Sequence, residues 1–423
     1  MCTAIITPKK LSGTITAPPS KSELHRAIIC AAMAEGPSEI NNVSLSNDVL
    51  ATLNAVKALG ASVMFAENKL MINGSSAFKG NKVEIDCDES GSTLRFLIPI
   101  VASFGIDATF NGKEGLAKRP LGPYLDTLPE HGVNINFNNR FPLSLSGCLK
   151  GGRFAVPGDI SSQFISGLLF ALPRLSHDSE IYISSPLESS NYVDLTIGIL
   201  SHFGIEIIKK ENTFFIPGKQ TFKAATYNVG GDWSSASFFA VAGALGDTVH
   251  INGLSVDSLQ GDKAILKVLE KYGINYNFSG DMLSVYPSEI NPTDIYSAQI
   301  PDLVPILSVL AAKANGPSKI WGASRLKYKE SNRLKAIFQY LKVLGADLEE
   351  TDDGFIINGK SEFSKCALKG CNDHRIVMAM AIAATVATGK VSISDAQAIH
   401  KSYPNFFEDF IKLGGIVNVI SLD

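Results

Sequence analysis

The first side chains in this sequence that suggest a function are basic residues near an expected helix start. Lys21, Ser22 and Arg26 follow Pro18-Pro19, and proline tolerates a helix entry but not a helix interior. Ser20 and Ser22 are natural N-caps for the helix that follows. Free backbone N–H groups and the helix dipole favour an anion at such a start. The stretch therefore predicts an anion site, with a capped helix carrying solvated basic residues as the alternative.

Similar cations recur along the chain close to the starts of other expected helices. They are Lys21, Arg26, Arg95, Arg119, Lys329, Arg333 and Arg375, with Lys401 late in the chain. Any one of them is explained by a solvated surface position. As a set, in a chain of net charge −3, they indicate a site for small, multiply charged anions such as phosphates and carboxylates.

Carboxylates stand beside some of these cations. Glu330 follows Lys329 at the start of an expected amphipathic helix, with Lys329 and Arg333 one turn apart. Glu330 could be a tuned acid or base, or a helix-start glutamate in a salt bridge. Asp302 begins an expected buried helix after Pro301, where it could be a functional carboxylate or simply the N-cap.

A polar run, Asn372-Asp373-His374-Arg375, precedes a wholly apolar helix. Polar groups at that place either cap the helix or serve function. An imidazole beside a guanidinium resists protonation, which suits an anion contact or a neutral donor.

Composition limits the classes of protein to consider. The 423 residues are 45% hydrophobic and 19% charged, typical of a soluble chain of two or three domains. A net charge of −3 gives no basic field for nucleic acid or a membrane surface. We expect a cytoplasmic protein, because residues 1–10 lack a signal-peptide core and the apolar run 376–387 is too short to cross a bilayer. Scattered cysteines also suggest a reducing compartment: Cys2, Cys30, Cys87, Cys148, Cys366 and Cys371.

The expected strands and helices that carry the charged residues follow a pattern that recurs six times. Each copy has a short strand, a small polar cluster, a buried small-residue helix, a second strand and an amphipathic helix ending at glycine, and the first five continue into a hairpin. The clusters are Ser20-Lys21-Ser22, Glu89-Ser90-Gly91-Ser92, Asp159-Ile160-Ser161-Ser162, Asp232-Trp233-Ser234-Ser235, Pro301-Asp302 and Asn372-Asp373-His374-Arg375. The glycines are Gly60, Gly132, Gly204, Gly273, Gly345 and Gly414, each placed where a helix needs a left-handed C′ residue. The sequence therefore predicts a βαβαββ unit of about 70 residues.

The sixth copy is short, and the strand expected at residues 3–8 has no unit of its own. We therefore expect residues 1–20 to complete the last repeat, since an incomplete unit would leave a face unburied. The predicted fold is α/β with two similar domains of three repeats each. One domain comprises residues 1–20 and 229–423, the other residues 21–228, with the active site expected in the cleft between them.

Three familiar motifs are rejected. Residues 354–361 match the Walker A pattern, but residues 355–357 are expected to form a hairpin strand and no buried helix follows. Cys366, Cys371 and His374 lack a nearby fourth ligand, so no metal is expected. No GxGxxG opens a helix, so no nicotinamide cofactor is expected either.

Taken together, the motifs resemble those of the 5-enolpyruvylshikimate-3-phosphate synthase family, over essentially the whole chain. The segments that carry the resemblance are Pro19-Ser20-Lys21-Ser22 with Arg26, Ser90-Gly91-Ser92 with Arg95, Arg119-Pro120-Leu121-Gly122, Ser161-Ser162-Gln163-Phe164, Gly231-Asp232 with Ser234-Ser235, Pro301-Asp302, Lys329-Glu330 with Arg333, Asn372-Asp373-His374-Arg375 and Lys401-Ser402-Tyr403-Pro404. The resemblance implies the enolpyruvyl transferase fold, in which both termini share one of two three-repeat domains.

It also implies an activity and its partners. The family transfers the enolpyruvyl group of phosphoenolpyruvate to the 5-hydroxyl of shikimate 3-phosphate and releases phosphate, on the route to chorismate and aromatic amino acids. It needs no cofactor or metal and is the target of glyphosate. Small-molecule substrates are thus the expected partners, without nucleic acid or membrane, and a monomer is expected.

The resemblance also implies roles for individual residues, carried over by their positions in the matching motifs. Lys21, Asp302 and Glu330 would be catalytic: Asp302 takes the hydroxyl proton, and Glu330, helped by Lys21, handles the methylene proton through a tetrahedral intermediate. Shikimate 3-phosphate would be bound by Lys21, Ser22, Arg26, Ser161, Ser162, Gln163, Ser189, Tyr192, Asp302 and Lys329. Phosphoenolpyruvate would be bound by Lys21, Gly91, Arg119, Gln163, Arg333, His374, Arg375 and Lys401.

The chain departs from the family pattern at three places. Glu89-Ser90-Gly91-Ser92 stands where many members have Asn-Ala-Gly-Thr, Lys118 where glutamate is common and Arg325 where asparagine is common. These departures leave the expected reaction class unchanged, while inhibitor sensitivity and fine contacts do not follow from the resemblance. The alternatives are the sister enzyme acting on UDP-N-acetylglucosamine, which usually has a cysteine in the loop here spanning 111–118, and a non-catalytic anion-binding repeat scaffold.

Overall fold

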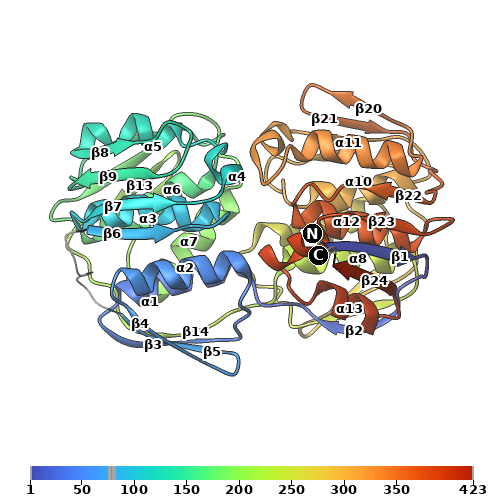
Figure 1. Ribbon diagram of the computed structural model, residues 1–423, viewed down its shortest axis with the longest axis horizontal. Coiled ribbons are helices and arrows are strands. Elements are labelled where there is room, and N and C mark those ends of the chain that lie inside the picture. The colour runs from blue at the N-terminus through green and yellow to red at the C-terminus, as the bar shows by residue number, and fades with distance from the viewer. Residues whose placement is uncertain (1, 75–77, 79–81, 422–423) are drawn as a thin grey trace. The chain divides into compact units, whose positions relative to one another are not determined.

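The chain forms two compact units. The computed structural model describes residues 2–74, 78 and 82–421. Unit 1 comprises Met1–Pro18 and Gly230–Asp423, and unit 2 comprises Pro19–Val229. In the colours of Figure 1, unit 2 runs from blue to green, and unit 1 contains the first strands and the yellow to red remainder.

Among the described residues, the strands form six four-stranded sheets, three in each unit. Every sheet has one parallel pair followed by two antiparallel pairs. In unit 2 the sheets are, in spatial order, β14 (Thr226–Asn228), β3 (Gly36–Asn41), β5 (Lys69–Gly74) and β4 (Ser62–Ala66); β6 (Lys82–Asp86), β7 (Asp107–Asn111), β9 (Leu143–Gly147) and β8 (Val133–Asn136); and β10 (Arg153–Val156), β11 (Ser179–Ile183), β13 (Thr213–Ile216) and β12 (Ile208–Lys210).

The sheets of unit 1 follow the same plan. They are β2 (Gly13–Thr16), β15 (Val249–Asn252), β17 (Met282–Val285) and β16 (Tyr276–Ser279); β18 (Ile295–Tyr296), β19 (Ser318–Trp321), β21 (Gly354–Ile357) and β20 (Leu348–Thr351); and β22 (Cys366–Leu368), β23 (Val391–Ile393), β1 (Cys2–Thr7) and β24 (Ile416–Ser421). The predicted hairpin is thus present in five of the described sheets, and in the sixth β1 pairs with β24 from the other end of the chain.

The N-terminal strands are divided between two sheets, which corrects one expectation. β1 pairs with β23 and β24 and so completes the last repeat, as predicted. β2, however, pairs in parallel with β15, where Ile15 lies opposite Ile251. The sheet of the first repeat takes β14 instead, with Tyr227 opposite Ile40. The sequence pattern could not decide between these partners, because β2 and β14 are both short. The alternation of apolar and polar residues specifies which face of a strand is buried, but not which strand lies beside it.

The first helix of each repeat is buried, as its apolar composition predicts. These helices are α1 (Lys21–Met33), α3 (Gly91–Ser103), α6 (Ser162–Ala171), α8 (Trp233–Leu245), α10 (Val304–Lys313) and α12 (His374–Thr385). Side chains at the N-cap accept a backbone hydrogen bond in five of them: Ser20, Ser90, Ser161, Asp232 and Asp373. Helix α10 differs, because its N-cap is Leu303. Asp302 therefore does not act as the N-cap of α10, which was the structural alternative to a functional role.

The second helices end at the predicted glycines. These helices are α2 (Asn47–Ala58), α5 (Gly122–Thr127) with η1 (Pro129–His131), α7 (Ser190–His202), η3 (Gly261–Ala264) with α9 (Ile265–Lys271), α11 (Arg333–Leu344) and α13 (Phe406–Lys412). All six glycines have positive φ, from 73° at Gly273 to 103° at Gly60. One start differs from expectation: α11 begins at Arg333 with Asn332 as its N-cap, so Lys329 and Glu330 precede the helix.

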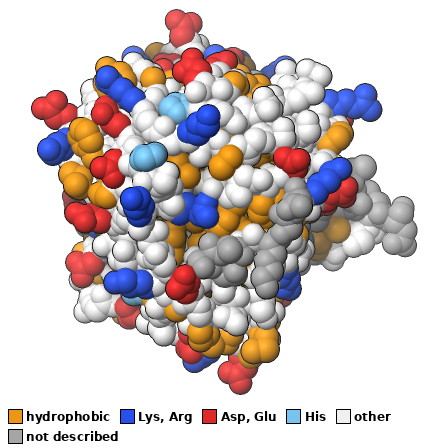
Figure 2. All heavy atoms as spheres, turned by 90° about the vertical axis from the view of Figure 1, so that its left-hand side faces the viewer, with side chains coloured by type: hydrophobic (Ala, Val, Ile, Leu, Met, Phe, Trp, Pro, Cys, Tyr) orange, Lys and Arg blue, Asp and Glu red, His pale blue; other side chains and the backbone are white. Residues whose placement is uncertain are grey.

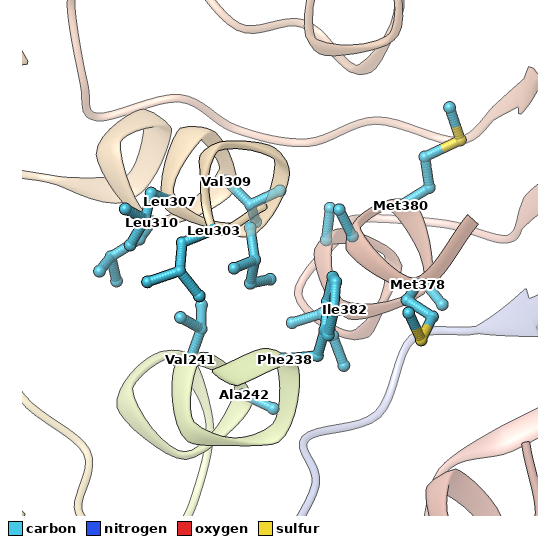
Figure 3. Packing of buried hydrophobic residues seen from close by; sticks show 14 of the residues in the cluster. Phe238, Val241, Ala242, Leu303, Leu307, Val309, Leu310, Met378, Met380 and Ile382 are labelled. Atoms are coloured by element: carbon cyan, nitrogen blue, oxygen red, sulfur yellow. The ribbon is translucent and has the colours of Figure 1, made fainter. Parts of the chain in front are cut away.

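Three buried helices form the centre of each unit. Figure 3 shows this for unit 1, where Val241 of α8 and Leu303, the N-cap of α10, point towards one another and Ile382 of α12 points into the same space. Unit 2 has a separate apolar cluster that includes residues of α1, α3 and α6. Close packing of this kind leaves the helix starts little freedom to move, so the side chains carried there are held in place.

The remaining short helices are α4 (Glu114–Ala117), η2 (Leu172–Arg174), η4 (Ser324–Tyr328) and η5 (Ala396–Lys401). The rejected Walker A segment begins with strand β21 and is followed by β22, which carries Cys366, so the rejection of that motif is confirmed. Within the described ranges, no helix has the length and apolar character needed to cross a membrane. Figure 2 shows acidic and basic side chains mixed over one face of unit 2.

Candidate active site

Unit 1 contains a buried cluster of charges centred on Arg333, which we call the Arg333 cluster: Asp302, Lys329, Glu330, Arg333, Asp373 and Arg375. The Arg333 side chain is only 1% exposed. Its Nη1 donates to Asp302 Oδ1 at 2.7 Å and its Nη2 to Glu330 Oε2 at 2.6 Å. Its Nε donates to Asp373 Oδ2 at 2.8 Å, and Nη2 reaches Asp373 Oδ1 at 3.1 Å. One guanidinium therefore joins three carboxylates that are far apart in the sequence.

Local structure explains how these groups meet. Asp302 lies in the turn before α10, and Arg333 is the first residue of α11. Asp373 caps α12, where its Oδ1 accepts the backbone N–H of Arg375 at 3.0 Å. Because the first helices of unit 1 pack together, the turns that precede them bring their polar groups to the same place.

Two further cations approach Asp302. Lys329 Nζ lies 3.4 Å from Asp302 Oδ1, and Arg375 Nη2 lies 3.3 Å from Asp302 Oδ2. Burial alone would raise the pKa of Asp302, but Arg375, Lys329 and Arg333 outweigh it and hold that pKa well below its usual value. Burial would likewise lower the pKa of Arg333, yet Asp373, Glu330 and Asp302 raise it. Asp302 and Arg333 are therefore held in their charged forms at neutral pH.

Lys329 is the member of this cluster whose charge is easiest to change. Burial lowers the pKa of Lys329 to about 8, against the opposing effect of Asp302. Its positive charge is therefore present below pH 8 and lost as the pH rises through 8. If that charge holds an anionic substrate, kcat/KM should fall about fivefold between pH 8 and pH 9.

The variant Lys329→Arg is expected to move this alkaline limb upward, because a guanidinium stays protonated throughout that range. The measurement is a pH profile of kcat/KM from pH 6.5 to pH 9.5. Lys327→Arg, at a neighbouring exposed position, is the matched control and should keep the limb of the unmodified protein. An unchanged limb in Lys329→Arg would assign the titration to another group.

Other predicted residues of unit 1 lie around the start of α12. His374 is the first residue of α12 and is 2% exposed. Lys401, at the end of η5, donates from Nζ to Asn372 O at 2.5 Å and is 7% exposed. Their buried positions beside Asp373 and Arg375 suit anion contacts better than a solvated surface role.

Sequence reasoning missed Asp262 of η3. This carboxylate is 1% exposed and accepts a hydrogen bond from Ser234 Oγ at the start of α8. Burial, followed by the nearby charge of Asp302, raises the pKa of Asp262 to about 6, although Arg375 opposes the shift. The Gln260-Gly261-Asp262 run has no spacing signal that would have distinguished it from an ordinary turn.

Unit 2 carries the second group of predicted residues, beginning with Lys21 at the first position of α1. Lys21 Nζ lies 2.7 Å from Asp48 Oδ2 in the first turn of α2. The two side chains are 17% and 12% exposed, so the pair is accessible to a ligand. Sequence reasoning did not predict Asp48 as a site residue either, because nothing in its spacing indicates that α2 packs beside α1.

Arg26 is almost completely buried. It is 3% exposed, and it donates to Thr196 Oγ1 at 2.8 Å, Ser22 O at 2.7 Å and Tyr192 O at 3.2 Å. Burial lowers its pKa to about 10. These contacts join α1 to α7, so Arg26 also has a structural role. Tyr192 presents its backbone oxygen to Arg26, with its ring 6.0 Å from the guanidinium carbon.

A second arginine of unit 2 positions Gln163. Arg95 Nη1 donates to Gln163 Oε1 at 2.8 Å, and Gln163 Nε2 donates to Ser92 Oγ at 3.0 Å. Ser161 is the N-cap of α6, Ser162 is its first residue, and Ser189 is the N-cap of α7 with φ of 53°. These residues place hydroxyl and amide groups at helix starts, which are suited to binding oxyanions.

Gly91 opens α3 directly against Arg119. A Cβ at this position would lie 2.7 Å from Arg119 Nη1 and 2.8 Å from its Cζ. The absence of a side chain therefore allows the guanidinium to sit at the start of the helix, where both favour the same anion.

The variant Gly91→Ala should displace Arg119 and raise the KM for the anionic substrate bound there by at least about tenfold. Stability should change by less than about 1 kcal/mol, because the displaced group is the end of a flexible side chain. Steady-state kinetics and thermal unfolding test this. Gly115→Ala in α4 is the control, since a Cβ there meets nothing within 4 Å. Equal kinetics for both variants would contradict the proposed contact.

Comparisons with known proteins show which family this chain resembles over its length. The family model described as EPSP synthase (3-phosphoshikimate 1-carboxyvinyltransferase) matches residues 5–410. A Clostridium perfringens protein named 3-phosphoshikimate 1-carboxyvinyltransferase is 44% identical over 418 residues, covering 98% of this chain and 98% of that protein. A solved EPSP synthase from Acinetobacter baumannii is 25% identical, with a TM-score of 0.83 over 100% of both chains. The enolpyruvyl transferase NikO from Streptomyces tendae has a TM-score of 0.81 at 17% identity, over 100% of this chain and 99% of NikO.

Six similar sheets, buried helices and charged helix starts define an enolpyruvyl transferase fold, as the sequence predicted. The match over nearly the whole chain is more specific: the chain belongs to the EPSP synthase family.

Proposed function

We propose that this chain is an enolpyruvyl transferase that moves the enolpyruvyl group of phosphoenolpyruvate to the 5-hydroxyl of shikimate 3-phosphate and releases phosphate. The observation that carries the proposal is the convergence of Lys329, Arg333 and Arg375 on Asp302, in a member of this family. Both substrates carry phosphate and carboxylate groups, so preorganised cations stabilise them and the charge that develops between them. The product is used on the route to chorismate and aromatic amino acids.

The addition step joins the 5-hydroxyl oxygen to C2 of phosphoenolpyruvate, and Asp302 takes the hydroxyl proton. Three cations hold the pKa of Asp302 low, which makes it a weak base as it stands. Anionic groups of the substrates attract the same cations, and contact with them reduces the pull of those cations on Asp302. We therefore expect the basicity of Asp302 to rise when the substrates bind.

The methylene carbon gains a proton in the addition and loses one in the elimination. Glu330 handles this proton with help from Lys21, and the C2–O bond to phosphate breaks in the second half of the reaction. Glu330 accepts from Arg333 at 2.6 Å, which fixes one of its carboxylate oxygens.

The remaining predicted residues serve as substrate contacts. We assign shikimate 3-phosphate to Ser22, Arg26, Ser161, Ser162, Gln163, Ser189, Tyr192 and Lys329, and phosphoenolpyruvate to Gly91, Arg119, Gln163, Arg333, His374, Arg375 and Lys401, with Lys21 near both. The chain is proposed to act as a monomer in the cytoplasm. Its described cysteines are free, in keeping with a reducing compartment.

The test is phosphate release by the purified chain with both substrates and with each omitted. Release that requires both phosphoenolpyruvate and shikimate 3-phosphate supports the proposal. Release with UDP-N-acetylglucosamine in place of shikimate 3-phosphate would favour the sister enzyme instead. Binding of either anion without any release of phosphate would favour the non-catalytic scaffold.

A further inference from the structure

A chain of buried hydrogen bonds crosses three helices of unit 2. His25 Nδ1 lies 2.7 Å from Thr52 Oγ1, which lies 2.7 Å from Thr93 Oγ1. Thr93 Oγ1 donates to Ser90 Oγ at 2.7 Å. All four residues are at most 1% exposed. They belong to α1, α2 and α3, with Ser90 as the N-cap of α3. We call these four residues the hydroxyl relay.

Each hydroxyl has one proton to donate, and this fixes the donor and the acceptor of each hydrogen bond in the relay. Thr93 has one hydroxyl proton and gives it to Ser90, so it accepts from Thr52. Thr52 has then used its only proton and must accept from His25. The imidazole therefore carries its proton on Nδ1, and its Nε2, which is buried and has no hydrogen-bond partner among the described residues, carries none. Burial, with Lys21 and Arg26 nearby, lowers the pKa of His25 well below its usual value and keeps the ring neutral.

The relay lies one helical turn below the Lys21 site. His25 follows Lys21 by four residues on α1, and Thr52 follows Asp48 by four residues on α2. The contact between Lys21 and Asp48 and the contact between His25 and Thr52 are both 2.7 Å long and join the same two helices. Residues four apart lie on one face of a helix, so the two contacts form adjacent rungs between α1 and α2.

At its other end, the relay reaches the start of α3. Thr93 donates to Ser90 through both its hydroxyl and its backbone N–H, the latter at 3.2 Å. Ser90 directly precedes Gly91, the residue that lies against Arg119. Thr52 is the link between the helix that carries Asp48 and the helix that begins at Gly91.

We propose that His25, Thr52 and Thr93 are positioning residues that hold Lys21 and Gly91 in the register needed to bind phosphoenolpyruvate. This inference rests on the proposed function. A buried chain of hydrogen bonds stabilises the fold only when each donor and acceptor in it has a partner. Removing one hydroxyl leaves a donor and an acceptor without partners and lowers the stability of the fold. Loss of the relay should therefore shift α1 and α3 relative to α2 and disturb substrate binding more than the chemical step.

The variant Thr52→Val removes the central hydroxyl while keeping the shape of the side chain. We expect the KM for phosphoenolpyruvate to rise at least about tenfold, with a smaller change in kcat. Thr52→Ser restores a hydroxyl and should return KM to within about threefold of the unmodified protein. Thr385→Val is the matched control: this threonine is 4% exposed, lies at the end of α12 and donates to Ile382 O of its own helix.

Nuclear magnetic resonance of protein labelled with ¹⁵N-histidine tests the relay without any substrate. The signal of His25, one of seven histidines, is identified by its loss in His25→Gln. We expect a neutral ring protonated on Nδ1 that does not titrate between pH 6 and pH 8. Because this measurement needs no turnover, failure of the relay and failure of the proposed function are distinguishable.

A His25 ring protonated on Nε2 would overturn the proposal, as would an unchanged KM in folded Thr52→Val or an equal rise in Thr385→Val. Thr93→Val breaks the next link and is the second variant if Thr52→Val does not fold. Failure of both to fold would assign the relay to folding alone and overturn the positioning role.

Discussion

Replacing Arg333 by methionine is expected to lower the free energy of unfolding by about 3–5 kcal/mol and to remove detectable turnover. Arg333 is 1% exposed and is the shared partner of Asp302, Glu330 and Asp373. Its loss leaves three carboxylates close together in a buried place, with Lys329 and Arg375 left to offset them. Turnover should fall by at least about a thousandfold, because a preorganised cation of the proposed site is removed.

The pH dependence of this effect has a definite sign. The pKa of Asp302 is held low in the folded protein, so the charged carboxylate stabilises the fold above its unfolded pKa, and this contribution is lost at acid pH. Without Arg333 that contribution shrinks. The stability difference between Arg333→Met and the unmodified protein should keep its full size from pH 7 to about pH 5 and decrease as the pH falls below about 4, as measured by urea unfolding at each pH.

Arg153→Met is the matched control for this experiment. Arg153 pairs with Glu180 at 3.2 Å, but its side chain is 65% exposed, so its loss should change stability by less than about 1 kcal/mol. Wild-type stability in Arg333→Met, or a stability loss that grows towards acid pH, would contradict the electrostatic account of the cluster.

Lys21→Met should reduce turnover by about a thousandfold or more while leaving the protein folded. The lysine pairs with Asp48 at 2.7 Å, and both side chains are partly accessible, so water can solvate Asp48 when its partner is lost. The expected loss of rate combines a missing anion contact and missing assistance to proton transfer. Phosphate release measures the rate, and circular dichroism with thermal unfolding measures the fold.

The control for Lys21→Met is Lys113→Met. Lys113 Nζ also lies 2.7 Å from an aspartate, Asp88, but its side chain is 62% exposed and it has no assigned role. Near-normal rates are expected for this variant. A wild-type rate in Lys21→Met would remove Lys21 from the mechanism, whereas an unfolded Lys21→Met would show that the pair with Asp48 is needed for the fold.

Much of the fold could be predicted because its signals are local. A glycine after each second helix indicates a left-handed C′ residue, and all six have positive φ. Serine and aspartate at helix starts predict N-caps, and five of the first helices have them. Apolar residues all round a helix predict burial, which α8 and α12 confirm.

Sequence patterns were therefore sufficient to predict the repeated βαβαββ unit, the helix starts near which cations lie and the family. They did not predict which groups meet: β2 pairs with β15, Arg333 joins three carboxylates, Asp48 faces Lys21, and His25, Thr52 and Thr93 form one relay. The physical reason is that caps, turns and hydrophobic periodicity act within a few residues of the chain. Pairings between side chains tens of residues apart depend on how whole helices pack, which no local pattern records.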